Sequence, residues 1–105
     1  MAQCEVQASA PERLSNMLEQ KLESVFAAPN SIIELQNSLR NICDVMPLDT
    51  HISANLRCNE QKALLTLTYN QPLFNPLILL PELPVDSTDY STDNERSTLK
   101  LSKSL

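Results

Sequence analysis

Hydrophobic residues in the first half of the chain recur every three or four positions, which is the spacing of one face of an α-helix. The pattern predicts two amphipathic helices, over residues 10–27 and 31–46, which stop near Pro29 and Pro47 because proline interrupts a helix. The connection between them is short, so we expect an antiparallel αα-hairpin. We expect a capping box at the start of each helix, with Ser9 paired to Glu12 and Ser31 paired to Glu34; Asn30 is an alternative cap for the second helix.

After Pro47 the hydrophobic residues recur at every second position, which is typical of a β-strand with one buried face. This alternation predicts strands at 52–58 and 63–69, joined by a four-residue loop at 59–62 built on a type I turn. A hairpin register that keeps the apolar side chains on one face is fixed by that alternation. It pairs Ile52 with Tyr69, Ala54 with Leu67, Leu56 with Leu65 and Cys58 with Ala63.

The remaining segments lack a clear period. Prolines punctuate an apolar stretch at 72–84 and exclude a helix there, and its run 77–80 fits a third strand along one edge of the hairpin. Residues 86–105 are rich in Ser, Thr and acidic residues, which favours a disordered tail, and residues 1–8 are interpreted as a flexible lead-in. The predicted fold class is therefore α+β: an N-terminal αα-hairpin followed by a small antiparallel sheet, in a single domain at 9–85.

The apolar faces of these predicted elements form one small core. Domains of this size bury a modest fraction of their surface and are marginally stable without disulfides or metals. We expect the most buried core residues to be Leu18, Leu22, Leu35, Leu39, Ile42, Leu56, Leu65 and Leu67.

The composition removes several classes of function, because the 105 residues include no glycine. Average usage would give roughly seven. Glycine allows positive φ and close approach of the backbone to a phosphate, so the phosphate-binding loops, the dinucleotide fingerprint, the EF-hand turn and the nucleophile elbow are excluded in their standard forms. No cofactor and no small-molecule substrate are inferred from what remains.

The net charge of −5 argues against binding to nucleic acid or to an anionic membrane, since both require clustered Lys and Arg. The eight basic residues are scattered, and the longest uninterrupted apolar run, 77–80, is far too short to cross a bilayer. The N-terminal segment does not read as a secretory signal. Three widely spaced cysteines without a Cys-x-x-Cys motif indicate a reducing compartment. We therefore expect an intracellular, cytoplasmic protein.

The candidates for chemistry are Cys43, Cys58 and His51. A thiol nucleophile next to histidine is the minimum for cysteine-dependent catalysis, but no cysteine-protease motif surrounds these residues. Their spacing also matches no known metal site. Both cysteines fall on apolar stripes, so we interpret them as small buried hydrophobes, and His51 as a solvated linker residue. No catalytic and no metal-binding residue is predicted, and a thiol-dependent enzyme stays an alternative.

The predicted hairpin leaves two sheet edges, and the chain has more apolar residues than a thin core can bury. An open edge and an apolar surplus indicate a protein partner or a homodimer. The residues expected to contact that partner are Arg57, Leu64, Thr66, Leu77, Ile78, Leu79 and Leu80.

Together these features predict a non-enzymatic interaction module, that is, an adaptor or a subunit of an intracellular complex. One alternative is a small acidic chaperone or inhibitor that holds a single client by β-addition. The hydroxyl groups of the tail lie among acidic residues, which fits phosphorylation or ordering on a partner; a merely solubilising tail is equally consistent with the composition.

Overall fold

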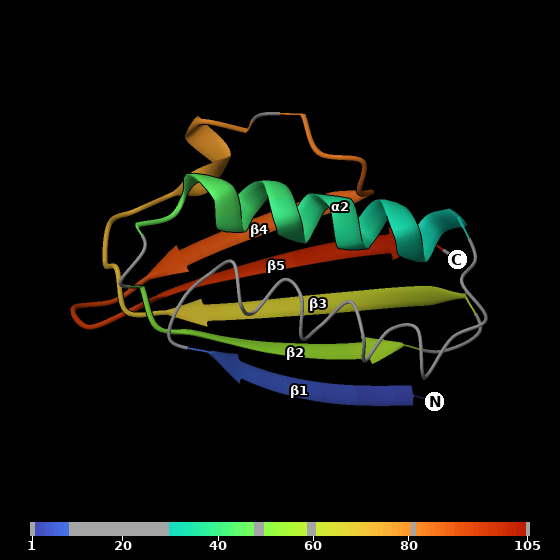
Figure 1. Ribbon diagram of the computed structural model, residues 1–105, viewed down its shortest axis with the longest axis horizontal. Coiled ribbons are helices and arrows are strands. Elements are labelled where there is room, and N and C mark those ends of the chain that lie inside the picture. Colours follow the sequence, from blue (N-terminus) through green and yellow to red (C-terminus); the bar gives the residue numbers. More distant parts are fainter. Residues whose placement is uncertain (1, 9–29, 48–49, 59–60, 81, 105) are drawn as a thin grey trace.

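The computed structural model describes residues 2–8, 30–47, 50–58, 61–80 and 82–104, and these form an antiparallel five-stranded sheet with one α-helix packed on it (Figure 1). The strand order is β1-β2-β3-β5-β4. The elements are β1 (Ala2–Ala8), α2 (Asn30–Val45), β2 (Ile52–Cys58), β3 (Lys62–Tyr69), the 3-10 helix η1 (Pro76–Ile78), β4 (Ser87–Thr92) and β5 (Ser97–Ser104).

The predicted fold class is wrong. Instead of an N-terminal αα-hairpin, a small sheet and a disordered tail, the described residues contain one α-helix and a sheet to which both ends of the chain contribute strands. The helix predicted at 31–46 is confirmed as α2. The helix predicted at 10–27, with its cap at Ser9, lies outside the described residues.

The predicted β-hairpin is confirmed in its register. β2 and β3 pair antiparallel, with Ile52 opposite Tyr69 and Leu56 opposite Leu65. The alternation of buried and half-buried residues along β3 follows the pleat of the strand. One buried face therefore fixed this register, because a slip by one residue would turn every apolar side chain to the opposite face.

The predicted lead-in and the predicted tail are strands. β1 pairs with β2, and β5 lies between β3 and β4. In β5 the fully buried Leu99 and Leu101 alternate with Thr98 and Lys100, so the strand presents two leucines to the core despite its polar composition. The β-branched side chain of Thr98 also suits an extended backbone. Alternation thus outweighs overall polarity in deciding the structure of residues 97–104.

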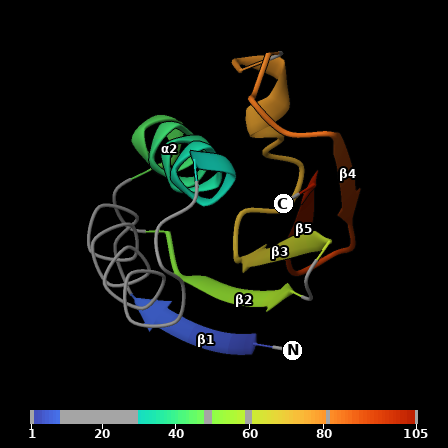
Figure 2. The same ribbon diagram turned by 90° about the vertical axis from the view of Figure 1, so that its right-hand side faces the viewer.

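The third strand predicted at 77–80 is also wrong, because this run begins in the 3-10 helix η1. The Asn75 side chain caps η1 by accepting a hydrogen bond from the Leu77 amide at 3.0 Å, and Pro76 occupies the first turn. η1 belongs to the connection from β3 to β4. Because β5 lies between these two strands, the connection, residues 70–86, crosses from one to the other and lies on the same face of the sheet as α2 (Figure 2). We call it the crossover.

The core lies between the sheet and these two covering segments. Six of the eight predicted core residues are buried, and the other two, Leu18 and Leu22, lie outside the described residues. Half-buried side chains of the crossover, such as Leu83 and Val85, pack against the same cluster. The buried apolar residues are Leu35, Leu39, Ile42, Cys43, Met46, Ile52, Ala54, Leu56, Ala63, Leu65, Leu67, Tyr69, Leu99 and Leu101.

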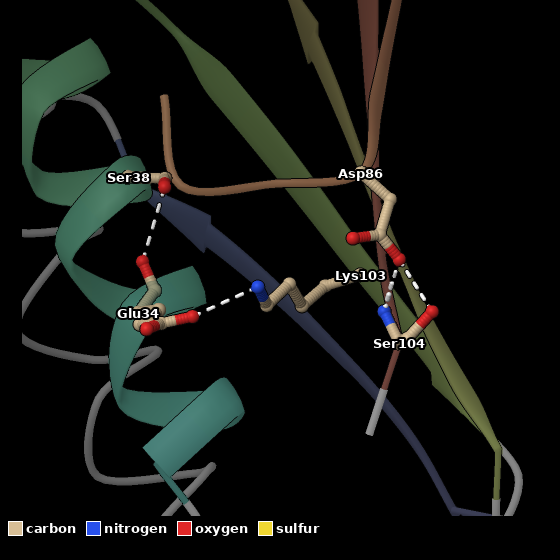
Figure 3. Close-up of polar contacts among 5 residues, drawn as sticks. All are labelled: Glu34, Ser38, Asp86, Lys103 and Ser104. Carbon is tan, nitrogen blue, oxygen red and sulfur yellow. Dashed lines mark hydrogen bonds and ion pairs between the residues drawn. The ribbon is translucent and has the colours of Figure 1, made fainter. Parts of the chain in front are cut away.

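Polar contacts at the end of β5 tie it to α2 and to the last residue of the crossover, Asp86 (Figure 3). The Lys103 ammonium lies 2.8 Å from the Glu34 carboxylate of α2, and this hydrogen bond raises the pKa of Lys103. The Asp86 carboxylate accepts hydrogen bonds from the hydroxyl and the amide of Ser104, the latter at 2.6 Å. These bonds lower the pKa of Asp86. The last strand of the chain is thus anchored on both sides.

We expect Leu39→Ala and Leu65→Ala each to lower the free energy of unfolding by about 2–5 kcal/mol, since each removes a side chain that is 1% exposed from between helix and sheet. Urea unfolding followed by circular dichroism measures the change. A loss below about 0.5 kcal/mol at both positions would contradict this packing, because surface substitutions have effects of that size.

Candidate interaction surface

The predicted partner-binding residues lie in two separate places. Arg57, Leu64 and Thr66 lie on the sheet face opposite α2, where Arg57 is exposed and the other two are half-buried. This face is mostly polar. In one row across four strands it carries Ser53, Thr68, Thr98 and Ser91, and in the next row Asn55, Thr66, Lys100 and Asp89.

Arg57 does not lie at a sheet edge. The sequence placed an open edge beside it, but β1 pairs with β2 along its whole length, and Gln3 lies opposite Arg57. Leu64 therefore stands as an isolated apolar residue on a polar face, which is ordinary for a soluble sheet. The outer face offers no apolar patch among the described residues.

The run from Leu77 to Leu80 divides into two inward and two outward residues. Leu77 and Leu80 are half-buried and pack against the core, as expected for positions i and i+3 of a 3-10 turn. Ile78 and Leu79 point outward, with 76% and 58% of their surface exposed. Two of the four predicted residues are therefore accessible to a partner.

A third exposed hydrophobic residue of the crossover, Leu73, is not among the predicted partner-binding residues. It is 83% exposed, and it has a φ of 69°. The Phe74 amide donates to the Gln71 carbonyl at 3.3 Å, so Pro72 and Leu73 are the central residues of a β-turn. A proline followed by a positive φ is the arrangement of a type II turn, whose third position prefers glycine. In a chain without glycine, Leu73 takes that position at a cost of about 1–2 kcal/mol.

Hydrogen bonds on both sides hold this turn in place. The Leu73 amide donates to Thr92 Oγ1 of β4 at 3.3 Å, and the Tyr69 hydroxyl of β3 donates to the Phe74 carbonyl at 2.6 Å. The rings of Tyr69 and Phe74 meet edge to face, with 6.4 Å between their centroids. Burial raises the pKa of Tyr69, so its hydroxyl stays protonated and remains a donor.

A buried serine anchors the start of the same turn. Ser97 of β5 has no exposed surface; its hydroxyl donates to the Gln71 carbonyl at 2.9 Å and lies 3.1 Å from the Tyr90 hydroxyl. The anchored backbone around Leu73 explains how an exposed leucine is held at positive φ. The signal in the sequence was the Pro-Leu pair, which marks a turn but does not reveal its type.

The sheet has two edge strands, β1 and β4, and no described strand lies beyond β4. The Asp93 amide donates to the Arg96 carbonyl at 2.9 Å, so Asp93 is directed toward β5. Since the direction alternates along an antiparallel strand, the backbone groups of Thr88, Tyr90 and Thr92 point away from β5. These groups form a row of donors and acceptors available to another strand.

The candidate thiol chemistry finds no support in the described residues. Cys43 is buried in α2, and desolvation, with a further contribution from Asp44, raises its pKa to about 12. His51 is exposed, and its amide donates to the Asn70 side chain at 2.9 Å. The side chain of Cys58 lies outside the described part of the structure. Within the described ranges, no group of three or more His, Cys, Asp or Glu residues is placed to hold a metal ion.

Comparison with known proteins assigns no family: no protein-family model matches the sequence, and no curated protein matches it either. Among the described segments, no helix has the length and apolar character needed to cross a membrane.

We expect Cys43 to react slowly with iodoacetamide in the folded protein. A pKa of about 12 instead of 9.0 leaves about a thousandfold less thiolate at neutral pH, and burial blocks access as well. A variant carrying Cys4→Ser and Cys58→Ser isolates this thiol, and mass spectrometry compares labelling in buffer with labelling in urea. Native labelling within about tenfold of the urea rate would contradict this burial and favour the thiol-enzyme alternative.

We expect Leu73→Asn to raise the free energy of unfolding of the isolated protein by about 0.5–1 kcal/mol, because asparagine tolerates positive φ better than leucine does. Thermal unfolding measures this change. Ile78→Asn serves as the control, because position 78 does not have a positive φ. A loss of stability at position 73 would show that the leucine side chain packs in the free protein.

Proposed function

We propose that this chain is a non-enzymatic protein–protein interaction module, an adaptor or subunit of an intracellular complex. The observation that carries the proposal is the exposure of three large hydrophobic residues, Leu73, Ile78 and Leu79, in a crossover whose other apolar side chains pack into the core. Burying one such side chain in an interface contributes roughly 1.5–3 kcal/mol. We call these three residues the exposed crossover residues.

The backbone around these residues supports a binding role. The backbone of this turn is held by the hydrogen bond from the Leu73 amide to Thr92 and by the one from the Tyr69 hydroxyl to the Phe74 carbonyl. A preorganised backbone loses less conformational entropy on binding than a mobile one. Backbone strain of this kind recurs at functional positions because a stable surrounding structure has to maintain it.

A second candidate function is a small acidic chaperone or inhibitor of a single client. The free edge of β4 favours it, because the backbone groups of Thr88, Tyr90 and Thr92 offer a template for an added strand of the client. The net charge of −5 favours a basic client. Both candidates bind protein, and they differ in whether the main chain of β4 or the exposed crossover residues make the principal contact.

Site-specific photo-cross-linking tests the proposal. A photoreactive phenylalanine analogue replaces Ile78 in the full chain, in cells of the native host, and a matched chain carries the analogue at Ser53 on the polar sheet face. We expect a discrete adduct from position 78 and none from position 53, since Ile78 is 76% exposed and is followed in the sequence by the exposed Leu79. Leu79→Asp in the position-78 chain should remove the adduct, because an interface core does not accept an unpaired charge.

The mass of the adduct distinguishes another protein from a second copy of this chain. Adducts of equal yield at positions 78 and 53 would contradict a specific surface at the crossover. No adduct at position 78 in folded protein would contradict the interaction proposal itself. A peptide array probed with the purified chain then separates the second candidate, since β-addition selects extended basic segments.

A further inference from the structure

We propose that a second copy of this chain pairs antiparallel along the free edge of β4, joining two five-stranded sheets into one continuous sheet. The inference rests on the proposed interaction function and names the partner for one surface. The observations that support it are the outward backbone groups of β4 and the positions of the acidic residues in and next to this strand.

The edge of β4 lacks the usual protection against strand addition. Sheet edges are normally blocked by proline, lysine, a bulge or a covering segment. β4 has the sequence STDYST with no proline and no lysine, and its pairing to β5 is regular from Ser87 to Thr92. Its single charged residue, Asp89, lies on the polar face, opposite Lys100 of β5, which has the opposite charge.

The alternating backbone restricts how two copies can pair. In an antiparallel pair, a residue whose backbone groups point outward hydrogen-bonds to another such residue. In β4 these residues occur at every second position, so two copies can pair only when the two-fold axis passes through a residue, and not when it passes between two neighbouring residues. An axis at Asp89 would place two aspartates opposite each other, and an axis at Ser91 would place Asp89 opposite Asp93. Like charges in such positions destabilise a pair.

An axis at Tyr90 avoids these contacts. It places Asp89 opposite Ser91, Thr88 opposite Thr92, and Tyr90 opposite Tyr90 of the second copy. Among the registers without facing acids it gives the longest overlap, five of the six residues of β4. Aromatic residues directly across from each other are a favourable cross-strand pair. The sequence of β4 is thus self-complementary in one register.

The same register gives the strained turn a partner. The Leu73 amide is bonded to Thr92, and Thr92 faces Thr88 of the second copy. Leu73 is thereby brought to the start of β4 in that copy, where Val85 is half-buried against the core. The exposed leucine would then cover the apolar end of the neighbouring subunit, which supplies a reason for holding it outward.

The charge at position 91 tests this register. Ser91→Asp places a carboxylate opposite Asp89 twice in the two-fold pair, whereas Ser91→Lys places an ammonium there twice. Ser53→Asp is the matched control, because Ser53 lies in the same row of the same face, on β2. Ser91 is exposed, so neither substitution removes a packed side chain.

Sedimentation equilibrium of the full chain over a hundredfold range of concentration measures the association. We expect a dimer for the natural sequence, a dissociation constant raised about tenfold by Ser91→Asp at low salt, and one lowered several-fold by Ser91→Lys. High salt should reduce both effects. Ser53→Asp should leave the constant unchanged. A variant that merely destabilises the fold cannot tighten the dimer, so the lysine variant keeps the test decisive.

A monomer at every concentration would overturn the self-pairing, and so would a dimer that responds equally to Ser91→Asp and Ser53→Asp. Masses that grow beyond the dimer would overturn it as well, since a two-fold pair closes. A monomer that still forms the position-78 adduct with another protein would leave the proposed function intact. A monomer without any adduct would overturn both.

Discussion

The pairing of β5 with β3 is the interaction on which the rest of the structure depends. Leu99 and Leu101, both fully buried, lie opposite Leu67 and Leu65 and complete the apolar layer under α2. β5 is the last strand in the chain, yet it occupies an interior position, and β4 pairs only with β5. Without β5 the core would lose two leucines, the Lys103–Glu34 ion pair and the attachment of β4.

This position of β5 also determines where the candidate surface lies. The chain has to cross from β3 to β4 over the intervening strand, and it does so on the face that carries α2 (Figure 2). The crossover therefore needs apolar residues on its inner side, and its tight turns leave Leu73, Ile78 and Leu79 outside. The same topology leaves β4 at the edge. Both proposed contacts thus follow from one topological feature.

The absence of glycine shapes the turns of this fold. At the β4–β5 turn the Asp93 carboxylate accepts hydrogen bonds from the amides of Glu95 and Arg96 at 2.8 and 2.9 Å, which also lowers the pKa of Asp93. An aspartate side chain thereby stabilises a turn that glycine often forms. At the turn formed by Pro72 and Leu73, Leu73 adopts the positive φ itself.

The sequence predicted the elements whose periodicity is strong. α2 and the β2–β3 hairpin each carry four or more apolar residues at one spacing, and both are confirmed. The two strands within residues 86–105 were not predicted, because β4 has one aromatic residue and β5 has two leucines, too few to outweigh a polar composition. The run 77–80 was wrongly predicted as a strand, because a short connection that packs on the core has the same run of apolar residues as a buried strand. Ile78 and Leu79 are among the predicted partner-binding residues. The exposure of Leu73 could not be predicted, because it follows from the type of the turn, which the Pro-Leu pair alone does not determine.

Native-state hydrogen exchange, followed residue by residue by NMR, tests the interior position of β5 most directly. The account predicts that the amides of Leu99 and Leu101 exchange only through global unfolding, at the same free energy as those of Leu65 and Leu67. Exchange of residues 97–104 at the rate of an unfolded chain, while β2 and β3 stay protected, would contradict it.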